Sequence, residues 1–455
     1  MSNKNDSNLG FLEKQFKLKE NNTDVKTEIF AGITIFMTMA YILVVNPNIL
    51  SESGMNWGGV FTATALSAAI ATSMMAFLAN YPFGLAPGMG LNAFFTYTVV
   101  FSMGKSWEFA LTAVFLEGII FIVLSFFNIR EAIFESIPMN LKKAVSVGIG
   151  LFIALIGLSN AEIIKSGKMV MENGSNILVE GGLIIELGNL QAATPLLALI
   201  GIFITGVLLA KNVKGALFFG IMITTLVGIP MGVTHMPANG ALFSMPPSLA
   251  PVFMKFEWGQ IFTWEMLLVV FTFLFVDVFD TVGTLIGVSS RANMLDKDGK
   301  LPKVKEALLA DAIGTTIGAA LGTSTVTTFV ESATGVAEGG RTGLTALTTG
   351  VMFLLALVFA PLFSMVPGAA TAPALILVGL FMMSAVKDIE FDDFTEGIPA
   401  FLTIIMMPFA YSIAEGIVFG MVSYVLLKVA SGKSKDVSPI MYVLAILFVA
   451  KSIFI

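Results

Sequence analysis

Long apolar segments separated by short polar ones fill the chain from residue 29 to its C-terminus. Most are about 18 to 25 residues long, the length at which a helix crosses roughly 30 Å of hydrocarbon. We predict about fourteen such spans, at 29–50, 60–80, 84–104, 107–128, 144–159, 193–210, 214–232, 263–287, 305–322, 324–340, 343–366, 370–386, 398–411 and 412–430. The last apolar stretch, from Pro439 to Ile455, is not counted as a span, and it is compatible with a helix along the cytoplasmic interface.

Composition supports a chain that lives in lipid. Hydrophobic residues make up 56% of the 455, charged residues 12%, and the mean hydropathy is +0.88, values that exclude a soluble globule of this size. Cysteine is absent, so no disulfide, thiol or cysteine-based metal site is available. The polar first 28 residues contain no apolar core of a signal peptide, and we expect them to remain as a cytoplasmic tail.

The basic residues indicate the orientation. With a cytoplasmic N-terminus and fourteen crossings, all but five of the 25 lysines and arginines lie on the cytoplasmic side, as the positive-inside rule requires. The exceptions are Lys105, Lys165, Lys168, Lys255 and Lys451. The basic residues are dispersed at span ends, so a net charge of -6 without a basic patch argues against a nucleic-acid partner.

Two spans carry residues that interrupt helices. Tyr81 to Phe95 contains two prolines and three glycines, and Leu321 to Gly340 begins with a threonine-rich stretch and continues into Glu331 and small residues. Both are predicted to be extended first and helical afterwards. Non-helical backbone persists at membrane depth only where protein or a water-filled cavity satisfies its polar groups.

The interrupted spans are third and tenth of fourteen, so they occupy equivalent places in two halves of seven. Matched interruptions of this kind indicate a transporter built on an inverted repeat. The alternative for either stretch alone is close helix packing with hinges, because glycine and proline are common in membrane helices.

Carboxylates inside the spans are costly, by about 2.5 to 3.5 kcal/mol each, and are usually functional. Asp277 and Asp280 lie three residues apart in the eighth span and so on one helix face. Two such carboxylates cannot both ionise cheaply, so one is expected to carry a proton near neutral pH. Glu331 lies where the tenth span turns helical, where the positive end of the half-helix stabilises an anion.

Several residues have simpler structural explanations. Asp280 can equally serve by hydrogen-bonding the backbone of a broken span, assisted by Thr281 and Thr284. Glu117 and Glu415 are expected to be packing or span-end groups, and His235 to be solvated in an external loop. Stacking on a flat ligand is open to three phenylalanines, for each of which lipid or core packing is the commoner role: Phe94, Phe95 and Phe329.

Four motifs together carry a family resemblance. They are Thr38-Met-Ala-Tyr41-Ile with Asn46-Pro, Ala86-Pro-Gly-Met-Gly-Leu-Asn92-Ala-Phe-Phe, Asp277-Val-Phe-Asp280-Thr-Val-Gly-Thr, and Glu331-Ser-Ala-Thr-Gly-Val-Ala-Glu-Gly-Gly-Arg341-Thr-Gly. With these motifs in this order, the chain resembles the AzgA-like adenine, guanine and hypoxanthine permeases of the nucleobase-ascorbate transporter superfamily. The resemblance extends from about Val25 to Lys428.

The resemblance implies an all-α polytopic fold of fourteen spans in a seven-plus-seven inverted repeat, with spans three and ten broken by short strands. After the 1–28 tail, it implies a core domain from 29–143 and 262–366 and a gate domain from 144–235 and 367–430. Residues 431–455 form the C-terminal tail.

It also implies a purine site between the third and tenth spans. Asp277 and Glu331 would hydrogen-bond the purine edge, Gly90 and Asn92 would shape the pocket, and the backbone of Met89 and Val330 could donate or accept. Supporting or proton-coupling positions are Asp280, Thr38 and Ser332.

The resulting function is secondary active import of a purine nucleobase by proton symport, through an alternating-access, elevator-like movement. No cofactor is expected beyond the co-transported proton, which is favoured over sodium, although the hydroxyls from Thr323 to Thr328 leave a sodium site open. The expected setting is a bacterial plasma (inner) membrane, with lipid as surroundings and a homodimer as a plausible assembly.

Two other classes compete. An anion transporter of the same architecture would use bare half-helix N-termini or an arginine, but Glu331 occupies that place. An intramembrane aspartyl protease would pair aspartates from two helices, whereas Asp277 and Asp280 share one, and its Gly-x-Gly-Asp motif is absent. Which purine is preferred depends on contacts that no sequence pattern specifies.

Overall fold

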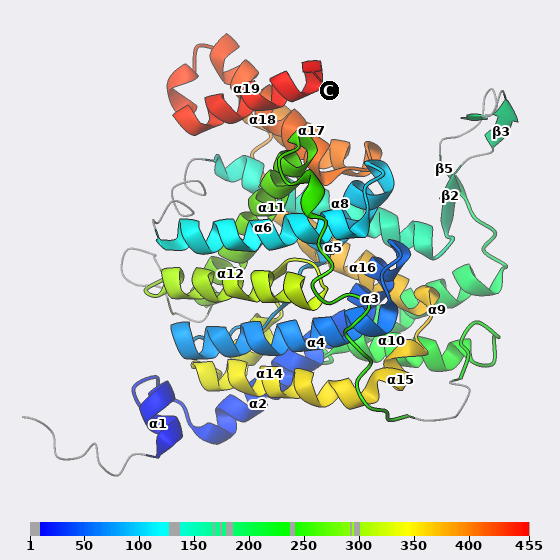
Figure 1. Cartoon of the computed structure of the whole chain (residues 1–455), viewed down its shortest axis with the longest axis vertical. Coiled ribbons are helices and arrows are strands. Elements are labelled where there is room, and N and C mark those ends of the chain that lie inside the picture. The colour runs from blue at the N-terminus through cyan, green and yellow to red at the C-terminus, as the bar shows by residue number, and fades with distance from the viewer. Residues whose placement is uncertain are drawn as a thin grey trace, which may run out of the picture.

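Helices dominate the computed structural model, which describes residues 10–126, 137–166, 169–172, 175–178, 185–236, 242–291, 294 and 301–454 (Figure 1). Within these ranges, eight helices are long and apolar enough to cross a membrane, and three more apolar helices are shorter. The chain is therefore a multi-pass membrane protein. The predicted number of about fourteen spans stays a prediction, because several of those spans are short or interrupted.

The first group of helices, here called the strand-bearing bundle, is built around α4, α12 and α14, with α2, α6 and α11 packed on them. Its elements come from two separate stretches of chain: α2 (Val25–Met39), α3 (Ile42–Glu52), α4 (Trp57–Met74), η2 (Met75–Ala79), β1 (Leu85–Pro87), α5 (Met89–Ala93), η3 (Phe94–Ser102) and α6 (Trp107–Phe126), then α11 (Trp264–Arg291), α12 (Val304–Leu321), β6 (Val326–Thr328), α13 (Ser332–Ala337) and α14 (Gly343–Ala356).

The second group, the flanking bundle, has α8 and α16 as its most extensively packed pair. It contains α8 (Met139–Asn160), α9 (Ala193–Ala210), α10 (Ala216–Gly228), α16 (Gly368–Met383), η6 (Ser384–Asp388), α17 (Phe394–Phe409) and α18 (Ile413–Ala430). It meets the strand-bearing bundle where α8 packs on α5 and α11, α16 on α3, and α10 on α2.

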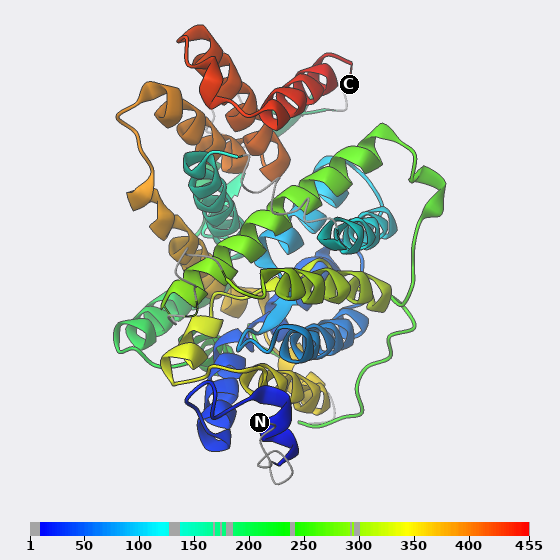
Figure 2. The ribbon, with the colours of Figure 1, turned by 90° about the vertical axis from the view of Figure 1, so that its left-hand side faces the viewer.

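Smaller elements lie around the two bundles. The N-terminal and C-terminal helices lie near opposite ends of the molecule's long axis (Figure 2). Between α8 and α9, two antiparallel strand pairs, β2 with β5 and β3 with β4, form an arm. The bounds of these elements are α1 (Phe11–Phe16), β2 (Ile164–Ser166), β3 (Met169–Glu172), β4 (Ser175–Leu178), β5 (Ile185–Leu187), η4 (Trp258–Gln260), η5 (Leu357–Phe359), α15 (Ala360–Ser364), η7 (Ser434–Asp436) and α19 (Pro439–Phe454).

Several element bounds differ from the predicted spans. Helix α8 begins at Met139 rather than at 144, and α17 begins at Phe394 rather than at 398. Polar residues open both helices, and hydropathy alone underestimates helices of this kind. The predicted first span is two helices, α2 and α3, separated at Ala40 and Tyr41. Five of the basic residues used for orientation lie outside the described residues: Lys4, Arg130, Lys168, Lys297 and Lys300.

Glu28 is a buried charge inside the predicted 1–28 tail. Helix α2 begins at Val25, so Glu28 lies in its first turn and has no exposed surface. Its carboxylate accepts from the backbone N–H groups of Arg341, Thr342 and Thr345 and from the hydroxyls of both threonines, at 2.6–3.2 Å. These bonds satisfy the free N–H groups at the start of α14 and join it to α2.

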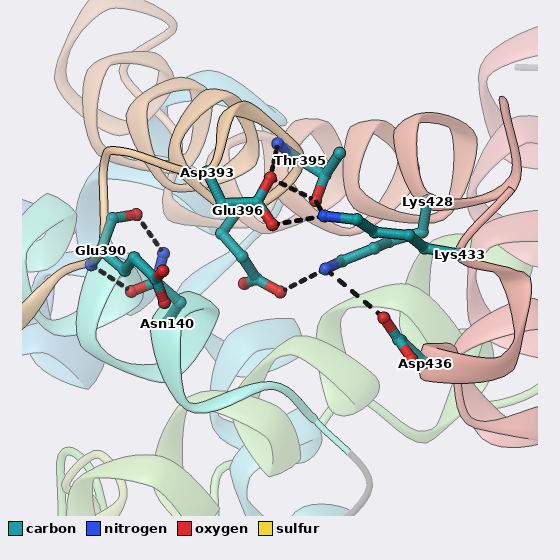
Figure 3. A network of polar contacts seen from close by, with 8 residues as sticks. All are labelled: Asn140, Glu390, Asp393, Thr395, Glu396, Lys428, Lys433 and Asp436. Atoms are coloured by element: carbon teal, nitrogen blue, oxygen red, sulfur yellow. Dashed lines mark hydrogen bonds and ion pairs between the residues drawn. The ribbon is translucent and has the colours of Figure 1, made fainter. Parts of the chain in front are cut away.

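Polar contacts also tie the ends of the flanking bundle together (Figure 3). Nearly buried Lys428 lies 2.7 Å from Glu396 and 4.0 Å from Asp436, which links α17, α18 and η7. Lys433 lies 2.6 Å from Asp393, the residue that caps α17. Because lysines gather at this end, it corresponds to the predicted cytoplasmic side.

The contact with Lys433 and the bonds from Thr395 hold the pKa of Asp393 well below its usual range. A carboxyl whose pKa falls on folding stabilises the fold above its unfolded value, about 3.9, and loses that contribution as pH falls further. We therefore expect Asp393→Asn to lower the melting temperature of the detergent-solubilised protein at pH 7, and the difference from the parent to shrink below about pH 4. The adjacent Asp392→Asn is the control. Equal melting temperatures for both variants at pH 7 would exclude this role.

Candidate functional site

The two helix-breaking segments meet at the centre of the strand-bearing bundle. Strands β1 and β6 pair antiparallel, with Leu85 opposite Thr328 and Pro87 opposite Val326. At one end of the strand pair, the N–H of Phe329 donates to the carbonyl of Gly84 at 3.0 Å. At the other end, the N–H of Gly88 donates to the carbonyl of Thr325, also at 3.0 Å. The extended backbone therefore satisfies its polar groups within protein, as membrane depth requires.

A threonine from a neighbouring helix completes each strand. The hydroxyl of Thr72 on α4 accepts from the N–H of Leu85 at 2.9 Å and donates to its carbonyl at 3.0 Å. The hydroxyl of Thr315 on α12 does the same for Val326, at 3.2 and 2.8 Å. Both contacts involve the first residue of the strand, so the two halves of the site are held by the same arrangement.

Glu331 lies just after β6, at the N-cap of α13. The hydroxyl of Tyr41, at the junction of α2 and α3, donates to its Oε1 at 2.8 Å. The Tyr41 ring lies 6.4 Å from that of Phe329. Glu331 is partly exposed and the preceding Val330 is 55% exposed, whereas the residues of β6 are buried. This turn therefore presents a carboxylate and the exposed Val330 next to aromatic rings.

Asp280 faces the same region from α11. It is partly exposed, and it interacts electrostatically with Glu331 and Asp311. A Cβ added at Gly88 would lie 3.6 Å from Asp280 Oδ2 and only 2.6 Å from Thr327 Cγ2. Gly88 is therefore required where the first broken span approaches the second, and Asp280 lies beside that approach.

Asp277 lies in a different environment. It is fully buried, and its Oδ1 is 3.1 Å from the hydroxyl of Thr281. The same hydroxyl lies 2.9 Å from Oδ1 of Asp311 on α12 and 2.7 Å from the hydroxyl of Thr327 on β6. The four side chains thus form a buried oxygen cluster directly behind strand β6.

The pocket-shaping candidates lie on α5, directly after β1. Gly90 faces α8, because a Cβ there would come within 2.8 Å of Ile149 Cγ2. Asn92 is fully buried and accepts a hydrogen bond from Ser324, while its Nδ2 has no hydrogen-bond partner within the described residues. Met89 is 6% exposed.

The supporting candidates hold α13 in place. The hydroxyls of Thr38 and Thr334 lie 3.2 Å apart and connect α2 to α13. Ser332 accepts from the N–H of Gly84 at 3.0 Å. Glu117 is fully buried and accepts from Thr325 at 2.6 Å, which fits the packing role expected for it, and His235 is exposed as expected.

Sequence reasoning missed two polar residues of this region. Tyr41 was noticed only as part of a motif, although a tyrosine in an apolar span needs a partner for its hydroxyl. Asp311 was overlooked as an intramembrane carboxylate, and its position in the small-residue span 305–322 was the signal that could have found it.

Comparison with known proteins assigns this arrangement to a family. The model of the Permease family matches residues 26–419, which include β1, β6 and the carboxylates beside them. This chain belongs to the permease family.

The permease also has close relatives along its whole length. It is 44% identical to the guanine/hypoxanthine permease PbuO of Bacillus subtilis, over 95% of this chain and 98% of that protein. It is 42% identical to the adenine permease AdeP of Escherichia coli, over 99% of this chain and 97% of that protein. These matches confirm the resemblance drawn from the four motifs and identify the permease as a transporter rather than an enzyme.

Among solved structures, the permease has the fold of the transmembrane domain of a cyanobacterium bicarbonate transporter, BicA. The TM-score is 0.60 at 16% identity, covering 87% of this chain and 96% of that one. At this identity the likeness concerns the fold alone.

Proposed function

We propose that this permease imports purine nucleobases of the adenine, guanine and hypoxanthine class by proton symport. The observation that carries the proposal is the pair of partly exposed carboxylates, Asp280 and Glu331, beside the paired strands. The names of the relatives PbuO and AdeP support the substrate class.

The chemistry of the site suits a purine. A purine presents N–H donors and N or O acceptors at the edge of a flat ring. Glu331 and Asp280 accept from its N–H groups, and the backbone of Val330 supplies a further donor or acceptor. Gly90, Asn92 and Met89 shape the opposite wall, and Thr38 and Ser332 hold α13.

This assignment places Asp280, rather than Asp277, against the base. Asp277 has no exposed surface and contacts Thr281, whereas Asp280 is partly exposed and lies near Glu331. The two residues are three positions apart on α11, and this spacing does not indicate which of them is exposed. Asp277 takes the proton-coupling role instead.

Counting protons at Thr281 supports that role. A hydroxyl has one proton to donate, yet Thr281 Oγ1 lies within 3.1 Å of a carboxylate oxygen of Asp277 and of Asp311. It donates to one of them, and the other contact is favourable only if that carboxyl carries a proton itself. We assign the co-transported proton to the Asp277 and Asp311 pair, next to β6 and the base.

The movement follows from the two bundles. The strand-bearing bundle acts as the core domain that carries the base, and the flanking bundle acts as the gate domain. The equivalent contacts of Thr72 and Thr315 support the inverted repeat. An elevator-like displacement of the core, in a plasma membrane with the N-terminus cytoplasmic, then exposes the site alternately to the two sides.

An anion substrate fits this site poorly, although the BicA fold is the same. Glu331 stands at the start of α13, where a bare helix N-terminus would bind an anion, and Asp280 adds a second negative charge.

Uptake of labelled hypoxanthine and adenine into cells lacking nucleobase permeases tests the proposal. We expect uptake to rise when the external pH is lowered from 7.5 to about 6, and to be unchanged when sodium is replaced by choline. Uptake that requires sodium at constant pH would replace the proton by sodium in the account, and absence of purine uptake by an expressed protein would overturn it.

A further inference from the structure

A cavity lies between the two bundles, away from Asp280 and Glu331. It has a volume of about 260 Å³ and is walled by polar and apolar side chains of α3, α8 and α16: Asn48, Ile49, Glu52, Asn160, Thr371 and Leu375. Two of these helices end there and α16 begins there.

The cavity is at the end of the molecule opposite the lysine-rich network. Helix α8 begins beside the end of η6, where Lys143 donates to the carbonyl of Asp388 at 2.7 Å, and finishes at the cavity with Asn160. The predicted orientation makes the cavity end the outer side of the membrane.

A polar contact across the two bundles borders the cavity. Glu52, at the end of α3, accepts from the hydroxyl of Tyr97 on η3 at 3.0 Å and from Nδ2 of Asn160 on α8 at 3.0 Å. Asn160 Nδ2 is also 3.0 Å from the Tyr97 hydroxyl oxygen. We call these three residues the outer latch, because they join the two bundles that must move relative to each other in the proposed transport.

Aromatic contacts next to the outer latch also join the two bundles. Tyr97 meets Tyr411 edge to face at 6.1 Å between ring centres, and Tyr411 meets Phe152 on α8 at 5.3 Å. Tyr411 follows α17, so the contact again joins η3 to the flanking bundle. The polar latch and the aromatic rings together close this side of the bundle interface.

The cavity offers a carboxylate, two carboxamides and a threonine hydroxyl between apolar walls. This is a set of acceptors and donors like the one a nucleobase edge requires, in a space large enough for one such base. We propose that the cavity is an outer docking site for the purine, and that the base opens the outer latch. The inference rests on the proposed purine transport.

When the base binds, Glu52 exchanges one hydrogen-bond donor for another and keeps the same number of bonds. A purine N–H donates to Glu52 in place of the Asn160 amide, so the carboxylate keeps its hydrogen bond while the link to α8 is lost. Asn160 is then free to turn to an acceptor on the base. A substrate with N–H donors thereby releases the outer side, whereas a simple anion has no N–H to offer and would be repelled by Glu52.

Thiol labelling tests the site, because the chain contains no cysteine and one introduced cysteine is the sole thiol. Gly368→Cys places it at the cavity, where an added Cβ meets nothing within 4 Å. Gly259→Cys is the matched control, equally open but on η4. Both are placed in an Asp280→Asn, Glu331→Gln background, so that the central site does not bind the base.

A membrane-impermeant maleimide is applied to right-side-out vesicles, with and without hypoxanthine. At ten times the dissociation constant of the cavity, about nine-tenths of the sites are filled, so labelling of Gly368→Cys is expected to slow about tenfold. Labelling of Gly259→Cys is expected to stay constant, and it also verifies that the background variant is present in the vesicles with this position open to the outside. Adding Glu52→Gln is expected to remove the protection, and adding Asn160→Ala to speed labelling without purine.

Equal labelling of Gly368→Cys with and without hypoxanthine, or equal protection of both cysteines, overturns the docking site. Uptake by the parent protein is measured in parallel. If the parent imports purines and no protection is seen, only the docking site is wrong, whereas a parent without purine uptake contradicts the proposed function itself.

Discussion

Glu331→Gln and Asp280→Asn are each expected to lower purine uptake about 10- to 100-fold. Loss of one hydrogen bond to a charged acceptor costs about 1.5–3 kcal/mol, and each 1.4 kcal/mol is a factor of ten in affinity. The amides keep the size of the carboxyl groups, so the change isolates their charge. Initial rates of labelled hypoxanthine uptake, with expression measured on the same cells, give the comparison.

Glu338→Gln is the matched control for this experiment. Glu338 follows α13, seven residues after Glu331, and pairs with Lys214 at the surface. An exposed ion pair contributes little, about 0–1 kcal/mol, so uptake by this variant should stay close to that of the parent. Full uptake in Glu331→Gln and Asp280→Asn would remove both residues from the site.

Asp311→Asn is expected to abolish concentrative uptake while leaving exchange of purine for purine. The amide resembles the protonated carboxyl and cannot release its proton, so the loaded carrier still moves but no longer couples movement to the proton gradient. The measurements are accumulation of hypoxanthine against its gradient at two external pH values, and exchange of labelled for unlabelled hypoxanthine at equal concentrations.

Thr281→Ser is the control for Asp311→Asn, because serine keeps the bridging hydroxyl, and it should retain pH-dependent accumulation. Thr281→Val, which removes the hydroxyl, should weaken it. A merely structural role of Asp311 predicts that exchange and accumulation fall together, and that result would assign the proton to another group.

Much of the fold could be predicted from the chain because lipid constrains it so strongly. Span length, positive-inside charge and the need to satisfy backbone polar groups each depend on local sequence. The interruptions at Tyr81 to Phe95 and Leu321 to Gly340 were visible for the same reason, since proline, glycine and clustered threonine disfavour a helix.

The environment of each carboxylate could not be predicted, because it depends on which helix lies opposite. The sequence places Asp277 and Asp280 on one helix face. In the structure, Asp277 contacts Thr281 behind β6, whereas Asp280 lies near Gly88 and Glu331. By its neighbours in the sequence, Glu28 belongs to a polar tail. Its five hydrogen-bond donors belong to Arg341, Thr342 and Thr345, which lie more than 300 residues later in the chain. Contacts at that separation leave no local pattern.

The shared fold with BicA shows why the site, rather than the architecture, determines the substrate. The same arrangement of helices can present a positive helix end or a carboxylate at the bundle centre. In this permease that position holds Glu331, bonded to Tyr41, and the proposed function gives this carboxylate the role of accepting from a ligand with N–H donors.

The measurement that tests the central claim most directly is equilibrium binding of labelled hypoxanthine to the purified permease, with unlabelled adenine, guanine, uracil and bicarbonate as competitors. We predict saturable binding that adenine or guanine displaces, that uracil displaces weakly and bicarbonate not at all, and that is lost in Glu331→Gln. Binding displaced by bicarbonate, or retained in full by Glu331→Gln, would contradict a purine site at Asp280 and Glu331.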